Sequence, residues 1–232
     1  MGRLITKSTS FTRPANTAAY AAGDNVAPVP LTITGASNAE PIVITSNGHG
    51  LTTGDFVTVA SVGGNTAANG SWYVTRIDAN TFSLDGSEGN GSYTSGGTAT
   101  RLLRLADILP ANYRRGLIIF TRLETNNPTI TNGTFRIYFL KEPFAQIADN
   151  AAWTLLTANK AKRAAKSADL TLATEGSGSD SSEAQDAQSV IPFEVAEGVT
   201  DLFLVLVAEG DYTPASGQVF FIEVAVEVPT GN

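Results

Sequence analysis

Short runs of β-branched and aromatic residues, separated by glycine, asparagine and aspartate, recur along the whole chain. A first group of these runs lies within residues 41–98, at 42–45, 56–59, 72–77 and 81–84. Runs of this length, with apolar and polar positions alternating, predict antiparallel strands, and the glycine and asparagine between them predict tight turns. Four or five such strands in so short a segment predict a small closed or half-closed barrel.

The remainder of the chain carries longer runs of the same kind. In one of them Phe135, Ile137 and Phe139 alternate with polar residues, which predicts a half-buried strand. Strands are expected at residues 100–105, 115–123, 134–140, 190–195, 202–208 and 219–228. Sandwiches with Greek-key connections pair strands that are distant in sequence, so the C-terminal strand is expected beside an early one.

These patterns predict an all-β fold: a jelly-roll-like antiparallel β-sandwich with an inserted small β-barrel domain. The sandwich would be discontinuous, formed by residues 1–40 and 99–232, with an extended N-terminal arm over residues 1–30. The insert would span residues 41–98 and project from one end of the sandwich, because the two ends of an insert need only lie close together.

Two segments depart from the strand pattern. Asp149 and Asn150 precede an alanine- and lysine-rich stretch that contains Trp153 and ends at Lys166, which predicts a short capped helix. Residues 175–188 are polar, acidic and free of large apolar side chains, which predicts a mobile loop.

Composition narrows the classes of function. The chain of 232 residues is 42% hydrophobic, enough for a real core, and it contains no cysteine, which excludes thiolate metal sites and thioester chemistry. A formal net charge of −7 argues against a nucleic-acid partner. The longest apolar run, residues 202–208, is only strand-sized, so no membrane partner is expected. Without a secretory signal, the chain is expected inside the cell or exported within a larger particle.

Two resemblances to known families are carried by short motifs. The first resemblance is carried by residues 44–51, 53–55, 69–70, 80–82 and 93–97. Together these motifs resemble a module that recurs in bacteriophage virion proteins and is named after the first catalytic-cysteine half-domain of ubiquitin-activating enzymes. The second covers residues 11–26 and is similar to the opening of a family of phage structural proteins on the capsid exterior. A looser continuation includes residues 135–138, Pro143 and the Asp149–Asn150 pair.

These resemblances imply a decoration or stabilising protein that binds the outer surface of the major capsid protein of a tailed phage. They imply a homotrimer on the capsid exterior of the virion, assembled in the host cytoplasm, with the N-terminal arm lying along a neighbour. The candidate contact residues are Phe11, Arg13, Tyr20, Arg114 and Arg115.

Two alternatives remain open. One is a tail or fibre protein whose insert binds host-surface glycans through Trp72, Tyr73 and Tyr93, although aromatic residues in so small a domain also serve as core. The other is a small hydrolase, which needs converging ionisable groups that a chain with one histidine and no cysteine supplies poorly.

Individual polar motifs do not point to catalysis. His49, the single histidine, has two interpretations, a general base or metal ligand and a residue that stabilises its turn, and we favour the turn. Residues 85–91 resemble part of a calcium loop, but they also have the composition of a glycine-rich hairpin tip. We therefore predict neither enzymatic activity nor a metal or cofactor.

Two basic clusters stand out in an acidic chain. One consists of Arg101, Arg104, Arg114 and Arg115, and the other spans residues 160–166. Either cluster could dock on an acidic capsid surface or on the acidic segment of a neighbouring subunit. For residues 160–166 we favour the simpler interpretation of a solvated helix face, whereas the first cluster stays undecided.

Overall fold

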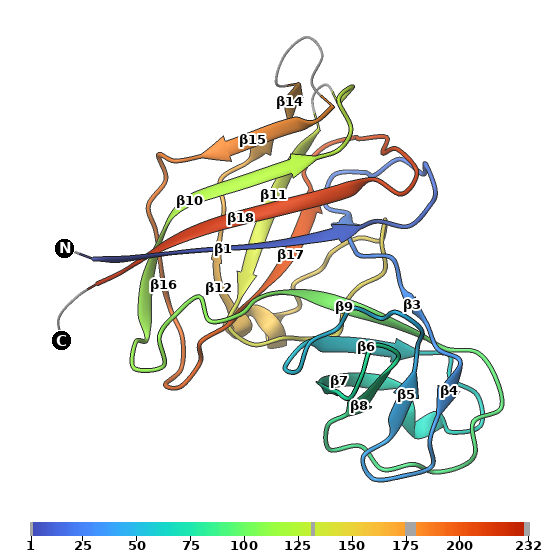
Figure 1. Cartoon of the computed structure of the whole chain (residues 1–232). Coiled ribbons are helices and arrows are strands. Elements are labelled where there is room, and N and C mark those ends of the chain that lie inside the picture. The colour runs from blue at the N-terminus through green and yellow to red at the C-terminus, as the bar shows by residue number, and fades with distance from the viewer. Residues whose placement is uncertain (1, 131–132, 175–179, 230–232) are drawn as a thin grey trace. The chain divides into compact units, whose positions relative to one another are not determined.

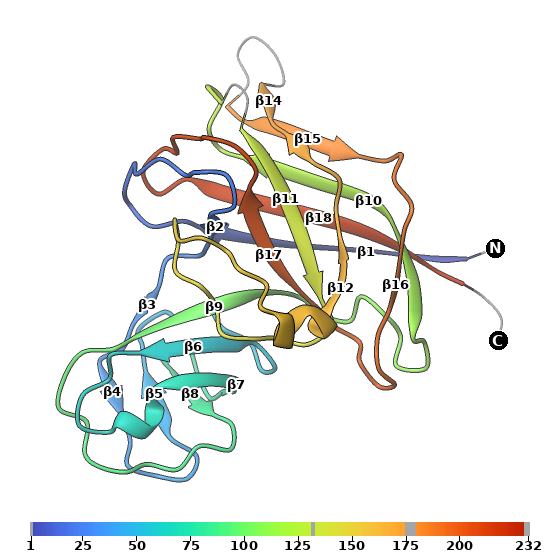
Figure 2. The same ribbon diagram turned by 180° about the vertical axis from the view of Figure 1, so that it is seen from behind.

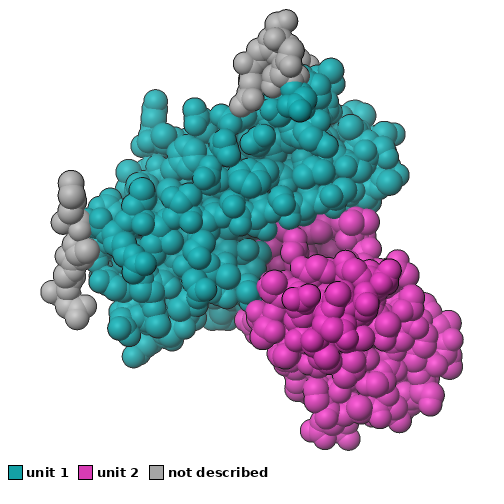
Figure 3. All heavy atoms as spheres, in the orientation of Figure 1, with its two compact units in different colours: residues 1–27, 104–143, 147–232 teal, residues 28–103, 144–146 magenta. Residues whose placement is uncertain are grey.

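The computed structural model describes residues 2–130, 133–174 and 180–229. The chain divides into two compact units, coloured separately in Figure 3. The sandwich unit comprises residues 1–27, 104–143 and 147–232, and the small unit comprises residues 28–103 and 144–146. Almost all regular structure in the described residues is antiparallel strand, so the predicted all-β fold is confirmed.

The sandwich unit contains two sheets, which Figures 1 and 2 show from opposite sides. In the first sheet the strand order is β1 (Arg3–Thr12), β18 (Val219–Val228), β10 (Arg115–Thr125), β15 (Ser182–Asp186) and β14 (Ala173–Thr174), with β16 (Ile191–Glu194) also paired to β10. In the second, β12 (Arg163–Lys166), β11 (Thr134–Leu140) and β17 (Leu202–Ala208) lie in that order, with β13 (Leu170–Thr171) on β11 and β2 (Asn25–Val26) on β17.

The core of this unit follows from the residue pattern. Phe135, Ile137 and Phe139 of β11 are fully buried, as their alternation predicted, and the ring of Phe135 lies 5.6 Å from that of Phe220 in the other sheet. All seven residues of β17 are buried, which explains why its sequence is continuously apolar. The inner faces of the two sheets thus close one hydrophobic core.

The first and last strands of the chain are neighbours, as predicted. All ten residues of β1 pair with β18, from Arg3 opposite Val228 to Thr12 opposite Val219. The ring of Phe11 stacks on that of Phe220, with centroids 5.5 Å apart. Residues 3–12 are therefore the edge strand of the chain's own sheet, with β18 on one side. That the N-terminal arm lies along a neighbour stays a prediction.

The predicted helix between Asp149 and Lys166 is wrong. Residues 149–156 contain no helix, residues Thr157–Lys162 form a single 3-10 helix, and Arg163–Lys166 is strand β12. Asn150 has a positive φ of 57°, which a helix does not accept, and the Asp149 carboxylate binds Arg13 and Tyr20 rather than capping a helix. Tertiary pairing of β12 with β11 then overrides the helical propensity of the alanine-rich stretch.

The predicted acidic loop is also partly wrong. Residues 175–179 lie outside the described residues, but Ser182–Asp186 forms β15 and pairs with Thr121–Thr125 of β10. The buried Ser182 hydroxyl donates to the carbonyl of Asn127 at 2.8 Å. Hydrogen bonds and ion pairs therefore hold this polar strand in place without large apolar side chains.

The small unit is one curved open sheet around its own core. Its strand order is β9 (Thr98–Leu105), β6 (Phe56–Ala60), β7 (Gly70–Arg76), β8 (Thr81–Leu84), β5 (Val43–Thr45) and β4 (Gly35–Ala36), with β3 (Leu31–Thr32) paired to β9. Residues 98–103 of β9 belong to this unit, which also contains a 3-10 helix at Thr66–Ala68. Consecutive strands β3 and β4 pair at its two edges, with β9 and β5 respectively, and the sheet is open where a closed barrel would have no edge.

The small unit extends further in both directions than the predicted insert of residues 41–98. Strand β3 pairs with β9 and strand β4 pairs with β5. Ile33 and Ala36, which lie before the predicted boundary, are buried in the same core as Ile44, Val57 and Phe82. The strands at 31–36 are too short to be recognised from the sequence, so the prediction left them in the other domain.

Candidate binding surfaces

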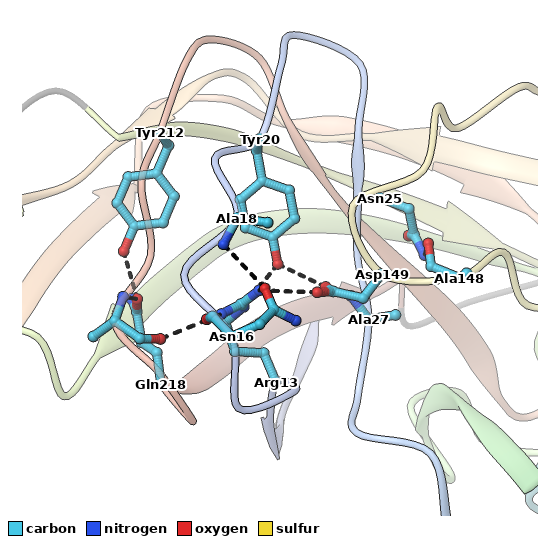
Figure 4. A network of polar contacts seen from close by, with 11 residues as sticks. Arg13, Asn16, Ala18, Tyr20, Asn25, Ala27, Ala148, Asp149, Tyr212 and Gln218 are labelled. Atoms are coloured by element: carbon cyan, nitrogen blue, oxygen red, sulfur yellow. Dashed lines mark hydrogen bonds and ion pairs between the residues drawn. The ribbon is translucent and has the colours of Figure 1, made fainter.

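A buried polar network stands where the resemblance to phage proteins predicted contact residues (Figure 4). The Arg13 guanidinium is almost completely buried and lies 3.0 Å from the Asp149 carboxylate. Its Nε donates to the Tyr20 hydroxyl at 2.9 Å, and that hydroxyl donates to Asp149 Oδ1 at 2.6 Å. The backbone N–H of Ala27 also donates to Asp149 Oδ1, at 3.0 Å. The positive charge of Arg13 is therefore balanced by the Asp149 carboxylate, and these buried polar groups find their hydrogen-bond partners inside the sandwich unit.

The electrostatics of this network keep Tyr20 protonated. Burial raises the pKa of Tyr20 above its ordinary value of 10.0, and the hydrogen bond to Asp149 and the negative charge of that carboxylate raise it further. Arg13 acts in the opposite direction but does not cancel these effects. The phenol therefore serves as a permanent hydrogen-bond donor and does not act as an acid or base near neutral pH.

The network continues into the C-terminal part of the chain. The rings of Tyr20 and Tyr212 stack with centroids 6.2 Å apart, and their backbones form an isolated antiparallel bridge. The Tyr212 hydroxyl donates to Gln218 Oε1 at 2.5 Å, and Gln218 Nε2 donates to Thr125 Oγ1 at 2.6 Å. Three segments far apart in sequence are thus fastened together by buried hydrogen bonds.

Phe11, Arg13 and Tyr20 are consequently interior residues, with exposed fractions of 5%, 1% and 1% for the whole residue. The structure does not support contacts with a partner through these side chains, because each of them already packs or forms hydrogen bonds within the chain. The sequence analysis placed these residues on a contact surface, whereas the structure places their side chains in the interior. The signal it lacked was the position of Asp149, which becomes a neighbour only in the folded chain.

Arg114 and Arg115, by contrast, lie on the surface. Their side chains are 56% and 76% exposed, and both approach the carboxylate of Glu194, at 3.6 and 3.5 Å. Arg114 lines a cavity of about 320 Å³ together with Lys141, Glu142 and residues 194–196. These two arginines therefore remain available for a partner.

The other basic residues fall into different environments. Arg104 lies 3.7 Å from Asp201, and Lys162 donates to the carbonyl of Pro143 at 3.3 Å. Residues 160–166 form a 3-10 turn followed by strand β12, so the interpretation as a solvated helix face is wrong in its geometry, although Lys160, Arg163 and Lys166 are exposed.

Only one of the three aromatic residues predicted on the insert surface is exposed. Trp72 packs against the core of the small unit, and its Nε1 donates to the carbonyl of Ala68 at 2.9 Å. The Tyr93 hydroxyl lies 3.0 Å from the carbonyl oxygen of Gly96. Tyr73 is 45% exposed, with its ring edge-on to that of Phe56. Two of the three aromatics thus serve the interior of the unit.

His49 stabilises its turn. The side chain is 5% exposed, its Nδ1 accepts the backbone N–H of Leu51 at 3.0 Å, and its Nε2 lies 3.1 Å from the carbonyl oxygen of Asp78. Because Nδ1 accepts, the ring proton must be on Nε2, which donates to that carbonyl. Both ring nitrogens are therefore occupied by backbone partners, which supports the turn interpretation over the catalytic one.

Residues in the segment 85–91, which resembles part of a calcium loop, make ordinary side-chain hydrogen bonds. Asp85 accepts from the hydroxyls of Thr75 and Ser83, at 3.3 and 3.4 Å. Among the described residues, no three histidine, aspartate or glutamate side chains gather closely enough to hold a metal ion. In the same part of the chain, no helix is long and apolar enough to cross a membrane.

Sequence reasoning missed an acidic cavity of about 210 Å³ at the far end of β10. Glu124, Asp180 and Asn126 contribute polar groups, and Val219 and Phe221 contribute apolar surface. These residues come from three separate segments, so no local motif marked the site. The acidic stretch around residue 180 was a signal, but its strand pairing was not predictable from its composition.

Comparison with known proteins bears on the small unit. Residues 39–102 match the FCCH domain of ubiquitin-activating enzyme E1. The match includes strands β5 to β8, the His49 turn and most of β9, and it confirms the resemblance of the module. It covers a minority of the chain, so it describes the small unit and not the whole protein. No curated protein matches the chain.

Proposed function

We propose that this protein is a structural component of a tailed-bacteriophage virion that decorates and stabilises the outer surface of the capsid. Catalysis is not part of this proposal. The protein would act by adhesion, through protein–protein contacts spread over the surface of the sandwich unit.

The observation that carries the proposal is the convergence of two motifs in one network. Residues 11–26 and the Asp149–Asn150 pair are the pieces that resemble phage structural proteins of the capsid exterior. In the folded chain, Arg13 and Tyr20 from the first piece bind Asp149 from the second. Proteins with the same fold are expected to share the residues whose contacts hold that fold together. The contacts of Arg13 and Tyr20 with Asp149 therefore favour a fold shared with those phage proteins over a chance similarity of sequence.

Lattice binding also suits the chemistry of the surface. A standard interface of about 1,600 Å² need not contain special residues, and repetition over a lattice adds stability by avidity even when single contacts are weak. The small unit, with its FCCH-like fold, would be the part that projects from the capsid. Its exposed side chains include a single one of the three candidate aromatics, Tyr73, which is less than a glycan platform requires.

The test is co-sedimentation of the purified protein with undecorated capsids of the phage that encodes it. We expect saturable binding and greater resistance of the decorated capsids to heat. A Tyr73→Ala variant should bind equally well, since this side chain belongs to the projecting unit. Failure to bind capsids, together with adhesion to host cells that Tyr73→Ala abolishes, would overturn the proposal in favour of a tail or fibre protein that binds glycans.

A further inference from the structure

Charge is segregated along strand β10 of the sandwich unit. At the start of the strand, Arg115 pairs with Glu194 of β16, and near its end Glu124 pairs with Glu183 of β15. These two positions are nine residues apart, about 30 Å along an extended chain. Figure 1 shows β16 and β15 at opposite ends of β10.

The basic end of the unit gathers cations from three segments. Lys141 follows β11, and its N–H donates to the carbonyl of Lys162 at 2.8 Å, while Arg163 of β12 pairs with Leu140. With the two arginines at the start of β10, the basic end comprises Arg114, Arg115, Lys141, Lys162 and Arg163. Glu142 and Glu194 line the same cavity as Arg114 and Lys141 and balance their charge, so the excess of positive charge at this end comes from Arg115, Lys162 and Arg163.

The acidic end carries the opposite excess. Arg122 is the cation nearest to it, and its guanidinium lies 3.7 Å from Glu124, 3.3 Å from Glu183 and 3.2 Å from Glu223. One cation among three carboxylates leaves a net negative charge. The acidic cavity beside them adds Asp180, and its lining also includes the apolar side chains of Val219 and Phe221.

We infer that the basic end of one copy docks on the acidic end of a second copy, with Arg115 entering the acidic cavity. Arg115 is the more exposed of the two arginines and has only a loose 3.5 Å contact with Glu194. In the cavity its guanidinium would meet carboxylates and an aromatic ring, and a guanidinium group binds both kinds of partner. The same ring already stacks with Arg122, whose guanidinium carbon is 5.3 Å from the ring centroid.

A second copy is the partner that the charge distribution favours. Molecules with a net charge of −7 repel one another, and a contact in which unlike patches face each other offsets this repulsion. Two different patches make a head-to-tail contact, which generates a closed ring when the rotation permits. The inference rests on the proposed function, because the capsid surface is where copies of the chain would lie side by side.

The test measures mass against concentration by sedimentation velocity, with the protein alone. We expect wild-type protein to associate, more weakly as salt rises. Arg115→Glu and Glu124→Arg should each lower the association constant at least tenfold, because each places like charges opposite one another. The double variant, in which every junction again joins a glutamate to an arginine, should recover association.

Arg76→Glu, an equal charge change on an exposed residue of the small unit, is the matched control and should associate as wild type does. Unchanged thermal unfolding checks that each variant is folded. A monomeric wild type, single reversals without effect, or a double variant no better than the singles would each overturn the inference. Because no capsid is present, such a result leaves capsid binding to its own test.

Discussion

Arg13 and Asp149 are separated by 136 positions in the sequence, and their side chains meet at 3.0 Å with exposed fractions of 0% and 8%. This ion pair fastens the segment after β1 to the loop before residue 150. A buried pair contributes little net stability relative to an apolar pair of the same shape, but removal of one partner leaves an uncompensated charge. The network is therefore sensitive to single substitutions.

The first prediction concerns this pair. Arg13→Met should lower the free energy of unfolding by about 3–5 kcal/mol, because it leaves the Asp149 carboxylate buried without its cation. Urea denaturation followed by circular dichroism measures the change. Arg115→Met, which removes an exposed arginine, is the control and should fall within about 0.5 kcal/mol of wild type. An Arg13→Met protein as stable as the control would show that the pair does not hold the segment.

The second prediction follows from the raised pKa of Tyr20. In the unfolded chain this phenol loses its proton near pH 10, whereas in the folded chain it keeps it to higher pH. The native state therefore binds more protons above pH 10, and stability must fall as pH rises. The loss is about 1.4 kcal/mol per pH unit for one such group. Burial also raises the pKa of Tyr212, so this residue adds to the same trend.

Urea midpoints measured between pH 9 and 11.5 test this expectation. Tyr20→Phe should be less stable at neutral pH, because it loses the hydrogen bond to Asp149, but its stability should fall less steeply above pH 10. Equal slopes for wild type and Tyr20→Phe would contradict the assignment.

Most strands could be predicted because each is defined by local pattern. The alternation in β11 and the continuous apolar run in β17 both identify strands without any knowledge of partners. The FCCH-like unit was recognisable for a related reason, since its turns depend on short glycine- and asparagine-containing motifs such as residues 47–50 and 53–55.

The sequence-based predictions were wrong where contacts with distant segments of the chain determine the local structure. The 149–166 stretch has helical propensity, but β11 recruits its last four residues as a strand. The polar segment 182–186 has weak strand propensity, yet the ladder with β10 and the Arg122–Glu183 ion pair hold it. Burial of Arg13 was not predictable either, because an arginine appears exposed until its distant carboxylate is known.

The third prediction concerns the His49 turn. His49→Ala removes the acceptor of the Leu51 N–H, which is buried, and the donor to the carbonyl of Asp78. We expect a loss of about 1–3 kcal/mol in the stability of the small unit and faster exchange of the Leu51 amide hydrogen. Hydrogen exchange followed by mass spectrometry or NMR measures this. Unchanged protection at Leu51 would show that the imidazole does not hold the turn.

The fourth prediction compares two glycines of the small unit that both have positive φ. Gly64 has φ +79°, and a Cβ there would collide with the carbonyl oxygen of Ser92 and with Thr94, whereas Gly48 has φ +61° and open space around it. Gly48→Ala should therefore cost only the left-handed backbone strain, about 1–2 kcal/mol. Gly64→Ala should cost about 3 kcal/mol or more, because the backbone at residues 92–94 must also move. The Trp153→Phe background leaves Trp72 as the remaining tryptophan of the chain, so fluorescence in urea reports on the small unit alone. If the two alanine variants lost equal stability in that background, the close approach of residues 64 and 92 would not be a feature of the folded protein.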